Sequence, residues 1–158
     1  MIFLSLVQLN FLMYMNQEIE PNQIIWVIRQ NANNEYYLDV GKCIGFKVIK
    51  ERNKNNYVWK IGVRSILTNR LIYSKVSNLN NTLFFDMKEA MSKLSSNKHA
   101  IILHFRRKYK FYDNHTCIIN DIEKTKFGVI YHCLDVETNN LRKIANLDIT
   151  KYIANFIY

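Results

Sequence analysis

The sequence predicts an α+β protein that is built mainly from antiparallel β-strands and contains two helices. About half of the 158 residues are apolar and 13% are aromatic, a composition that excludes disordered, collagen-like and low-complexity chains. Short apolar runs with an alternating pattern recur along most of the chain, as half-buried strands do. Apolar residues at helical spacing occur in two places, at about 86–97 and 148–157.

The first half of the chain is expected to form a sheet. Its strand candidates are separated by Asn-rich or other polar turns, and they are residues 24–30, 36–40, 43–50, 57–66, 70–76 and 82–85. The alternation is clearest in YVWKIGVRSI, in which apolar side chains alternate with Lys60, Gly62 and Arg64. Because neighbouring residues of a strand point to opposite faces, this strand should have one apolar and one basic face.

A helix should follow this sheet at about 86–97. Asp86 can accept hydrogen bonds from the first free backbone N–H groups, and Glu89 lies three residues later, as in a capping box. The apolar residues repeat at the spacing of one helix face, and they are Met87, Ala90, Met91 and Leu94.

The second half contains further strand candidates, at 100–112, 116–122, 127–136 and 141–146, with a tight turn at 123–126. Alternation along the first of these predicts two faces. The basic face would carry His104, Arg106, Lys108, Lys110 and Tyr112, and the core face would carry Phe105, Arg107, Tyr109 and Phe111.

The chain is expected to end in a helix at 148–157. Asp148 would cap it, and the apolar residues that follow have helical spacing. They are Ile149, Tyr152, Ile153, Phe156 and Ile157. This apolar stripe is expected to face the core of the protein, with a homodimer contact through the helix as the alternative.

The order of elements predicts two small sheet-plus-helix halves that share one core. Residues 15–97 form the first half with its closing helix, and residues 98–158 form the second half with the C-terminal helix. No Pro- or Gly-rich linker separates them. Residues 1–14 are a nearly uniformly apolar N-terminal extension. We favour an extension upstream of the natural start, with an added packing helix or a membrane anchor as alternatives.

Three cysteines, Cys43, Cys117 and Cys133, match no disulfide framework in number or spacing. Free thiols in a reducing compartment are the simplest interpretation, so we expect a cytoplasmic protein. The apolar N-terminal stretch is too short to span a membrane.

The best candidate metal ligands are His115, Cys117, His132 and Cys133. A tight turn at 123–126 would place Cys117 opposite His132, with Cβ atoms about 5 Å apart, near the separation that a shared zinc requires. The stronger interpretation is that these are ordinary buried strand cysteines and surface histidines, without a metal. A slip of one residue in the assumed register would also reverse the faces, so we predict no metal and no other cofactor.

The best candidate for catalysis is Asp86-Met87-Lys88, which follows the apolar run LFF. Metal-dependent nucleases can place an acid-x-Lys element at a strand end, where carboxylates hold Mg²⁺. Asp39 is a possible second acid. Helix capping already explains Asp86, so we expect a protein that is not an enzyme and keep a Mg²⁺-dependent nuclease as an alternative.

The positive charge is concentrated in two blocks. The chain has a formal net charge of +9, and residues 42–75 carry +8 while residues 98–110 carry +5. Uniform enrichment in lysine would not predict two blocks with acidic flanks, although ordinary solvated basic faces remain an alternative. A basic sheet face suits phosphate contacts, and nearby aromatic and arginine side chains can stack on unpaired bases.

We therefore expect a small protein that binds DNA or RNA through a cationic sheet face. The expected binding residues are Lys47, Lys50, Arg52, Lys60, Arg64, Arg106, Arg107, Lys108 and Lys110. The main alternative is an interaction module, or an inhibitor, that docks on an acidic protein surface of another nucleic-acid-handling protein. The groove hypothesis also requires that the two basic blocks share one surface.

Overall fold

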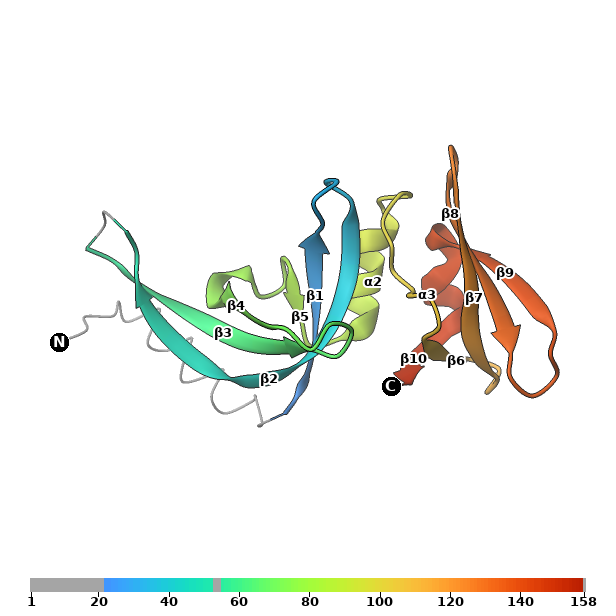
Figure 1. Cartoon of the computed structure of the whole chain (residues 1–158), viewed down its shortest axis with the longest axis horizontal. Coiled ribbons are helices and arrows are strands. Elements are labelled where there is room, and N and C mark those ends of the chain that lie inside the picture. Colours follow the sequence, from blue (N-terminus) through green and yellow to red (C-terminus); the bar gives the residue numbers. More distant parts are fainter. Residues whose placement is uncertain (1–21, 53–54, 158) are drawn as a thin grey trace. The chain divides into compact units, whose positions relative to one another are not determined.

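The computed structural model describes residues 22–52 and 55–157 (Figure 1). The expected apolar extension at 1–14 lies outside the described residues. The described chain contains two five-stranded sheets, one nine-residue α-helix and one short α-helix. All strand pairs with an assigned register are antiparallel, so the α+β prediction is confirmed.

The first sheet has the strand order β4-β3-β2-β1-β5. Its strands are β1 (Ile24–Gln30), β2 (Tyr36–Lys50), β3 (Tyr57–Ser65), β4 (Leu71–Lys75) and β5 (Leu83–Phe84). The two runs expected at 36–40 and 43–50 form one continuous strand, β2. Gly41 lies inside this strand, where a Cβ atom would come within 2.6 Å of the Arg64 carbonyl oxygen. Glycine at this position allows the close approach of β2 and β3.

The second sheet has the order β10-β6-β7-β8-β9. Its strands are β6 (Lys108–Phe111), β7 (Thr116–Thr125), β8 (Gly128–Asp135), β9 (Leu141–Ala145) and β10 (Ile153–Ile157). Thr125 pairs with Gly128, so the β7–β8 turn is shorter than the expected turn at 123–126. A bulge between Ile119 and Asp121 shifts the register of this hairpin.

The two sheets have the same topology. In each, four consecutive strands that pair in chain order are followed by a 3₁₀ helix, η1 (Val76–Asn78) or η2 (Asn146–Asp148). The next strand, β5 or β10, then pairs with the first of the four, β1 or β6. The sequence shows no convincing repeat, yet the backbone pattern recurs with an offset of seventy residues from β3 and β8 onward.

The turn after β3 and the turn after β8 show this correspondence in detail. The Ser65 hydroxyl accepts hydrogen bonds from two backbone N–H groups of the first turn, and the Asp135 carboxylate accepts the same pair in the second. Asn69 and Asn139, at matching positions, both have a φ of 59°. In both turns, a short side chain with an acceptor oxygen, Ser65 or Asp135, binds the free backbone N–H groups.

Helix α2 (Met87–Ser95) forms as predicted. The Asp86 carboxylate accepts a hydrogen bond from the Lys88 N–H at 3.1 Å, and the expected apolar face is buried. The prediction of a helix at 148–157 is wrong beyond the first helical turn. Helix α3 ends at Tyr152, and the next five residues form β10, which pairs with β6.

A bulge explains the incorrect helix prediction. It lies between Ile153 and Asn155 of β10, and it places Ile153 and Phe156, three residues apart, in the core. A regular strand buries residues at even spacing, whereas this spacing of three is the one that a helix produces.

The strand expected at 100–112 is also shorter than predicted, because only Lys108–Phe111 belongs to β6. Tyrosine hydroxyls bind the backbone before it. The N–H of Ile102 donates to the hydroxyl of Tyr131 at 2.8 Å, and the N–H of His104 donates to that of Tyr109 at 3.0 Å. These donors are satisfied without a neighbouring strand, so the segment need not be extended.

The chain divides into two compact units. Of the described residues, 22–25 and 40–85 belong to the first unit, and 26–39 and 86–157 belong to the second. The second unit has its own core, in which Met91 of α2, Ile149 of α3 and the large side chains of the second sheet are fully buried. The expected boundary after residue 97 stays a prediction.

Candidate nucleic-acid interface

Five cations share one face of the first sheet, and we call this set the cationic face. Lys47 of β2 lies directly opposite Lys60 of β3, and Lys60 lies directly opposite Lys75 of β4. Lys42 and Arg64 form a second opposed pair. Directly opposed residues of antiparallel strands project from the same face. The cationic face is therefore Lys42, Lys47, Lys60, Arg64 and Lys75, all in the first unit.

The contacts among the described residues leave most of this charge without a counter-ion. The Glu51 carboxylate lies 3.4 Å from the Lys75 ammonium. The Lys47 ammonium lies 4.9 Å from the ring centroid of Tyr73, and Arg64 donates to a backbone carbonyl at 3.2 Å. Like charges directly opposite one another destabilise a strand pair. A bound polyanion would therefore reduce the repulsion among Lys47, Lys60 and Lys75.

The register separates two expected binding residues from this face. Lys50 lies opposite Tyr57, and residues with odd numbers on β3 line the opposite face from Lys60. Arg52 follows the end of β2 and is exposed. Lys47, Lys60 and Arg64 are thus the expected residues of the first block that the structure brings together.

The second basic block is presented by a turn and by β6. The carbonyl of His104 accepts a hydrogen bond from the Arg107 N–H at 3.1 Å, which closes a β-turn with Phe105 and Arg106 at its centre. Strand β7 holds the turn, because the Arg106 N–H donates to the Ile119 carbonyl at 2.9 Å.

Arg106 has a strained backbone, with a φ of 65°. Among the described residues, every other non-glycine residue with positive φ is Asn, whose short polar side chain tolerates this region. An arginine has no such compensation and is strained by roughly 1–2 kcal/mol. Its guanidinium lies 5.1 Å from the ring centroid of Phe105, which is 52% exposed. The turn therefore presents a cation and an aromatic ring together.

This turn corrects part of the predicted face assignment. Phe105 was expected in the core but is exposed, because the chain turns where a strand was predicted. His104 was expected on the basic face, but its Nε2 atom is hydrogen-bonded to the Leu38 carbonyl. Burial lowers the pKa of His104, which therefore adds no charge at neutral pH. Tyr109 and Phe111 are buried as predicted.

Replacing Arg106 with glycine should separate binding from stability. Glycine adopts a positive φ without strain. The strain energy removed is larger than the entropic cost that glycine adds through the unfolded state, so we expect the free energy of unfolding to rise by about 0.5–1 kcal/mol. We expect affinity for a polyanion to fall because one cation is lost. Urea unfolding and a binding titration on the same sample measure both effects, and Arg106→Lys is the matched control. Unchanged affinity would remove this turn from the interface.

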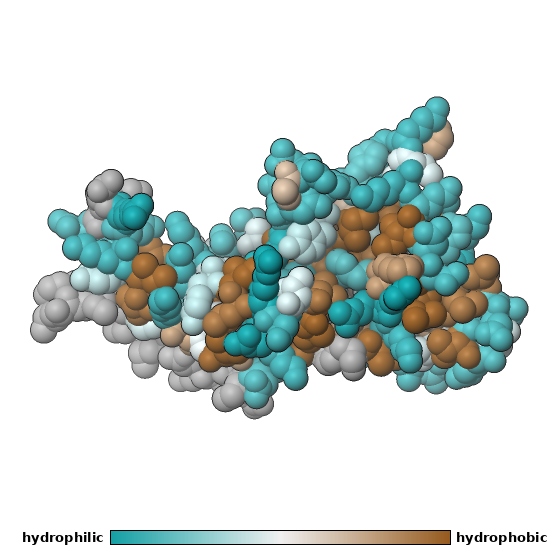
Figure 2. Space-filling view, in the orientation of Figure 1, coloured by the Kyte–Doolittle hydropathy of each residue, from teal (hydrophilic) through white to brown (hydrophobic). Residues whose placement is uncertain are grey.

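Lys108 and Lys110 of β6 are exposed and project from the face of the second sheet that is opposite its buried side chains. Across this outer face, Lys108 aligns with Ile157, Ile118, Leu134 and Leu141 of the neighbouring strands. Figure 2 shows apolar side chains at the surface among hydrophilic ones over β7–β9. This face is therefore mixed in character, unlike the cationic face of the first sheet.

The candidate metal set does not assemble. Cys117 lies opposite Asp135, and His132 lies opposite Asp121, because the hairpin turns between Thr125 and Gly128 and not at 123–126, which changes the register from the assumed one. Cys117 and Cys133 are both fully buried. Within the described ranges, no three His, Cys, Asp or Glu side chains form a group that could hold a metal ion.

His115 instead belongs to an ion-pair network at the end of the second sheet. Its Nδ1 atom is bound to the Asp135 carboxylate, and Arg142 lies between Asp135 and Asp113, 2.8 Å from the latter. The hydrogen bond to Asp135 raises the pKa of His115, and the same bond lowers the pKa of Asp135 to about 2. These charges are satisfied within the network.

The candidate nuclease residues are engaged in structural contacts. Asp86 caps α2, and the Lys88 ammonium lies 4.5 Å from the ring centroid of Tyr112. The carboxylate of Asp39 is paired with Arg29 at 2.7 Å. These contacts account for the three residues without catalysis.

All three cysteines are free and buried. Burial raises the pKa of Cys133 to about 12, which keeps its thiol protonated. None of the helices in the described ranges combines the length and apolar character needed to cross a bilayer.

Several residues of the interface were missed by the sequence analysis. Lys42 and Lys75 join the cationic face only through the strand register, and Tyr73 joins it through its contact with Lys47. The alternation of single strands gives no register. The two basic blocks belong to different units, so a shared surface stays a prediction. No protein-family model, curated protein or solved structure matches the chain.

Proposed function

We propose that this chain is a non-enzymatic protein that binds nucleic acid through the cationic face of its first sheet. The observation that carries the proposal is the row of three lysines, Lys47, Lys60 and Lys75, opposed across three neighbouring strands. Such a row weakens the free sheet by about 0.2–1 kcal/mol for each like-charged pair. A phosphate backbone laid across the strands would place negative charge against this row.

The turn at Arg106 supports a contribution from single-stranded regions. Exposed Phe105 and the adjacent guanidinium offer a flat apolar ring and a planar cation, and such groups stack on unpaired bases. The strain at Arg106 is consistent with a role in binding, because strained positions concentrate at functional sites.

A salt titration tests the proposal. Electrostatic binding to phosphates gives a linear fall of log affinity with log salt, with a slope of about −0.9 per phosphate contact on duplex DNA. With five cations on the face, we expect a slope between about −3 and −5, measured by fluorescence anisotropy on duplex DNA, single-stranded DNA and RNA. Absence of salt-sensitive binding at low ionic strength would refute the proposal.

The outer face of the second sheet favours one other function, docking on an acidic protein surface. There Lys108 stands between Ile157 and Ile118 in a row that continues to Leu134 and Leu141. A cation within an apolar row suits an acidic and partly apolar protein surface. This function predicts a complex that survives nuclease treatment and is lost on Leu134→Glu, whereas nucleic-acid binding predicts that nuclease abolishes co-purification.

A further inference from the structure

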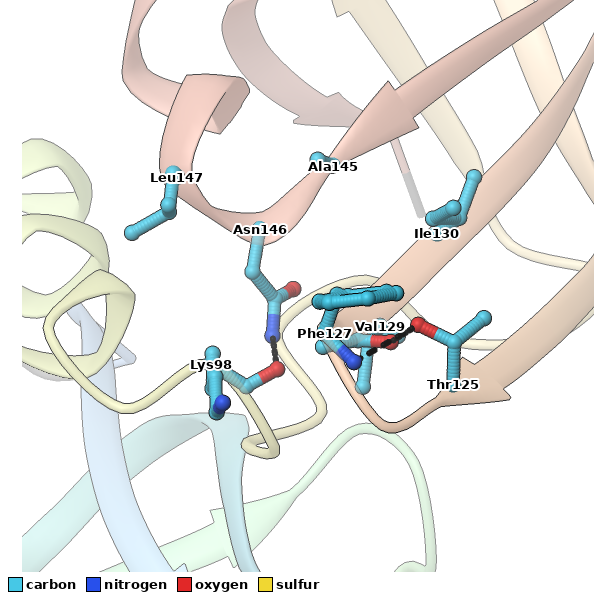
Figure 3. Close-up of a pocket in the computed structure, with 9 residues that line it drawn as sticks. Lys98, Thr125, Phe127, Val129, Ile130, Ala145, Asn146 and Leu147 are labelled. Atoms are coloured by element: carbon cyan, nitrogen blue, oxygen red, sulfur yellow. Dashed lines mark hydrogen bonds between the residues drawn. The ribbon is translucent and has the colours of Figure 1, made fainter.

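A pocket of about 100 Å³ lies in the second unit, at the tip of the β7–β8 hairpin (Figure 3). Three segments form it: the hairpin tip with Phe127, the loop after α2 with Lys98, and the start of η2 with Asn146. The rest of the pocket wall is apolar and includes Ile130, Ala145 and Leu147. None of these residues belongs to the cationic face or to the turn at Arg106.

Hydrogen bonds hold the three segments together. The Lys98 carbonyl accepts from the Val129 N–H at 2.9 Å and from the Asn146 amide nitrogen at 3.2 Å. The same amide nitrogen is bound to the Ala100 carbonyl. Thr125 closes the hairpin turn by accepting from the Phe127 N–H at 3.2 Å. The pocket is therefore formed before any ligand arrives.

The pocket contains a buried acceptor without a partner. Asn146 is 2% exposed, and its side-chain oxygen has no hydrogen-bond partner among the described residues. Figure 3 shows this oxygen between the Lys98 and Phe127 sides of the pocket, while the amide nitrogen points to Lys98. An unpaired buried carbonyl is destabilising, and a ligand with an N–H donor would remove that cost.

The fold itself does not require asparagine here. The matching position in the first sheet, at the start of η1, is Val76, which is also buried. An apolar residue therefore fills this place in the shared topology. The amide nitrogen of Asn146 ties two carbonyls together, but its unpaired oxygen has no structural role of that kind.

The mouth of the pocket is aromatic and positively charged. Phe127 is 77% exposed and Leu147 is 63% exposed, so both side chains are available to a ligand. The Lys98 ammonium is bound to the Lys126 carbonyl at 3.2 Å, and the Lys126 ammonium lies 5.1 Å from the ring centroid of Phe127. An aromatic ring, a buried acceptor and two ammonium groups are the contacts that one nucleotide needs.

We propose that this pocket receives one unpaired base of a single-stranded nucleic acid, and that it prefers bases with an exocyclic amino group. The ring would stack on Phe127, the amino group would donate to the Asn146 oxygen, and the adjoining phosphate would contact Lys98 or Lys126. Adenine and cytosine offer an amino group at the edge where thymine offers a carbonyl oxygen, which the Asn146 oxygen would repel. The inference rests on the proposed function and adds base recognition to it.

Short adenine, cytosine and thymine homo-oligomers, each labelled with a fluorophore, test the assignment with the full chain. We expect tighter binding of adenine and cytosine oligomers than of thymine oligomers. Phe127→Ala, at an exposed position, should weaken binding about fivefold or more. Asn146→Val, which installs the residue of the first sheet, should abolish the difference between the oligomers. Tyr152→Ala, at an exposed aromatic position outside the pocket, is the matched control.

The outcomes distinguish this inference from the proposed function. Salt-sensitive binding that is unaffected by Phe127→Ala, with no base preference, would overturn the pocket assignment and leave the cationic face intact. Absence of binding to every oligomer, with salt-sensitive binding of duplex DNA retained, would overturn the pocket assignment alone, whereas absence of binding to the oligomers and to duplex DNA would refute both. Adenosine monophosphate serves as a further probe: binding as tight as that of the oligomer would show that the pocket takes free nucleotides and would overturn its assignment to a strand. Circular dichroism confirms that each variant is folded.

Discussion

Lys60→Glu is expected to stabilise the protein and to weaken its binding. The substitution replaces two opposed like-charged pairs, with Lys47 and Lys75, by two opposite-charged pairs. Cross-strand pairs are worth about 0.2–1 kcal/mol each, so the free energy of unfolding should rise by about 0.5–1.5 kcal/mol. A negative charge at the centre of the cationic face should lower affinity for DNA at least tenfold at low salt, and the salt slope should shrink by about 1.

Urea unfolding and anisotropy titrations measure the two effects on one sample. Lys151→Glu makes the same change of charge at an exposed position in α3, outside both basic blocks, and should leave the affinity nearly unchanged. Equal losses in the two variants would show that affinity follows net charge alone. In that case the lysine row would have no special role in binding.

Tyr131 should be among the most sensitive residues of the second unit. It is fully buried, and its hydroxyl accepts the Ile102 N–H at 2.8 Å. Tyr131→Phe leaves that N–H unpaired, which should lower the free energy of unfolding by about 1–3 kcal/mol. Tyr131→Ala also opens a cavity and should lower it by about 3–5 kcal/mol.

Chemical denaturation followed by intrinsic fluorescence measures both losses. Tyr152→Phe is the matched control, because Tyr152 is 47% exposed, and it should change stability by less than about 0.5 kcal/mol. If Tyr131→Phe were as stable as the parent, the hydroxyl would not hold the segment before β6. The tyrosine hydroxyls would then not explain why β6 begins only at Lys108.

Local patterns of the sequence predicted secondary structure correctly where local interactions alone determine the backbone conformation. The strand at 57–66 and the helix begun by Asp86 were read from alternation, helical spacing and a cap. The incorrect predictions occur where tertiary contacts change the local pattern. The bulge after Ile153 imitates helical spacing, and the tyrosine hydroxyls bind a backbone that looks like a strand.

The sequence indicated that the candidate site would be a basic sheet face, but it did not indicate all of the residues that form it. Concentration of charge in two blocks indicated basic faces, and Lys60 and Arg64 follow from alternation alone. Opposition of Lys60 with Lys47 and Lys75 depends on the register, which is set by a bulge in β2 and by contacts across strands. The pocket around Asn146 needs three distant segments, and no local pattern indicates it.

The repeated turn after β3 and β8 has one consequence in acid. Ser65 and Asp135 receive equivalent backbone N–H groups, but only the aspartate titrates. The folded-state pKa of Asp135 is lowered to about 2, so its contribution to stability is complete above about pH 4 and is lost as the pH falls toward 2. Two turns with the same geometry thus differ in acid sensitivity, and only the one in the second unit is weakened when protons bind.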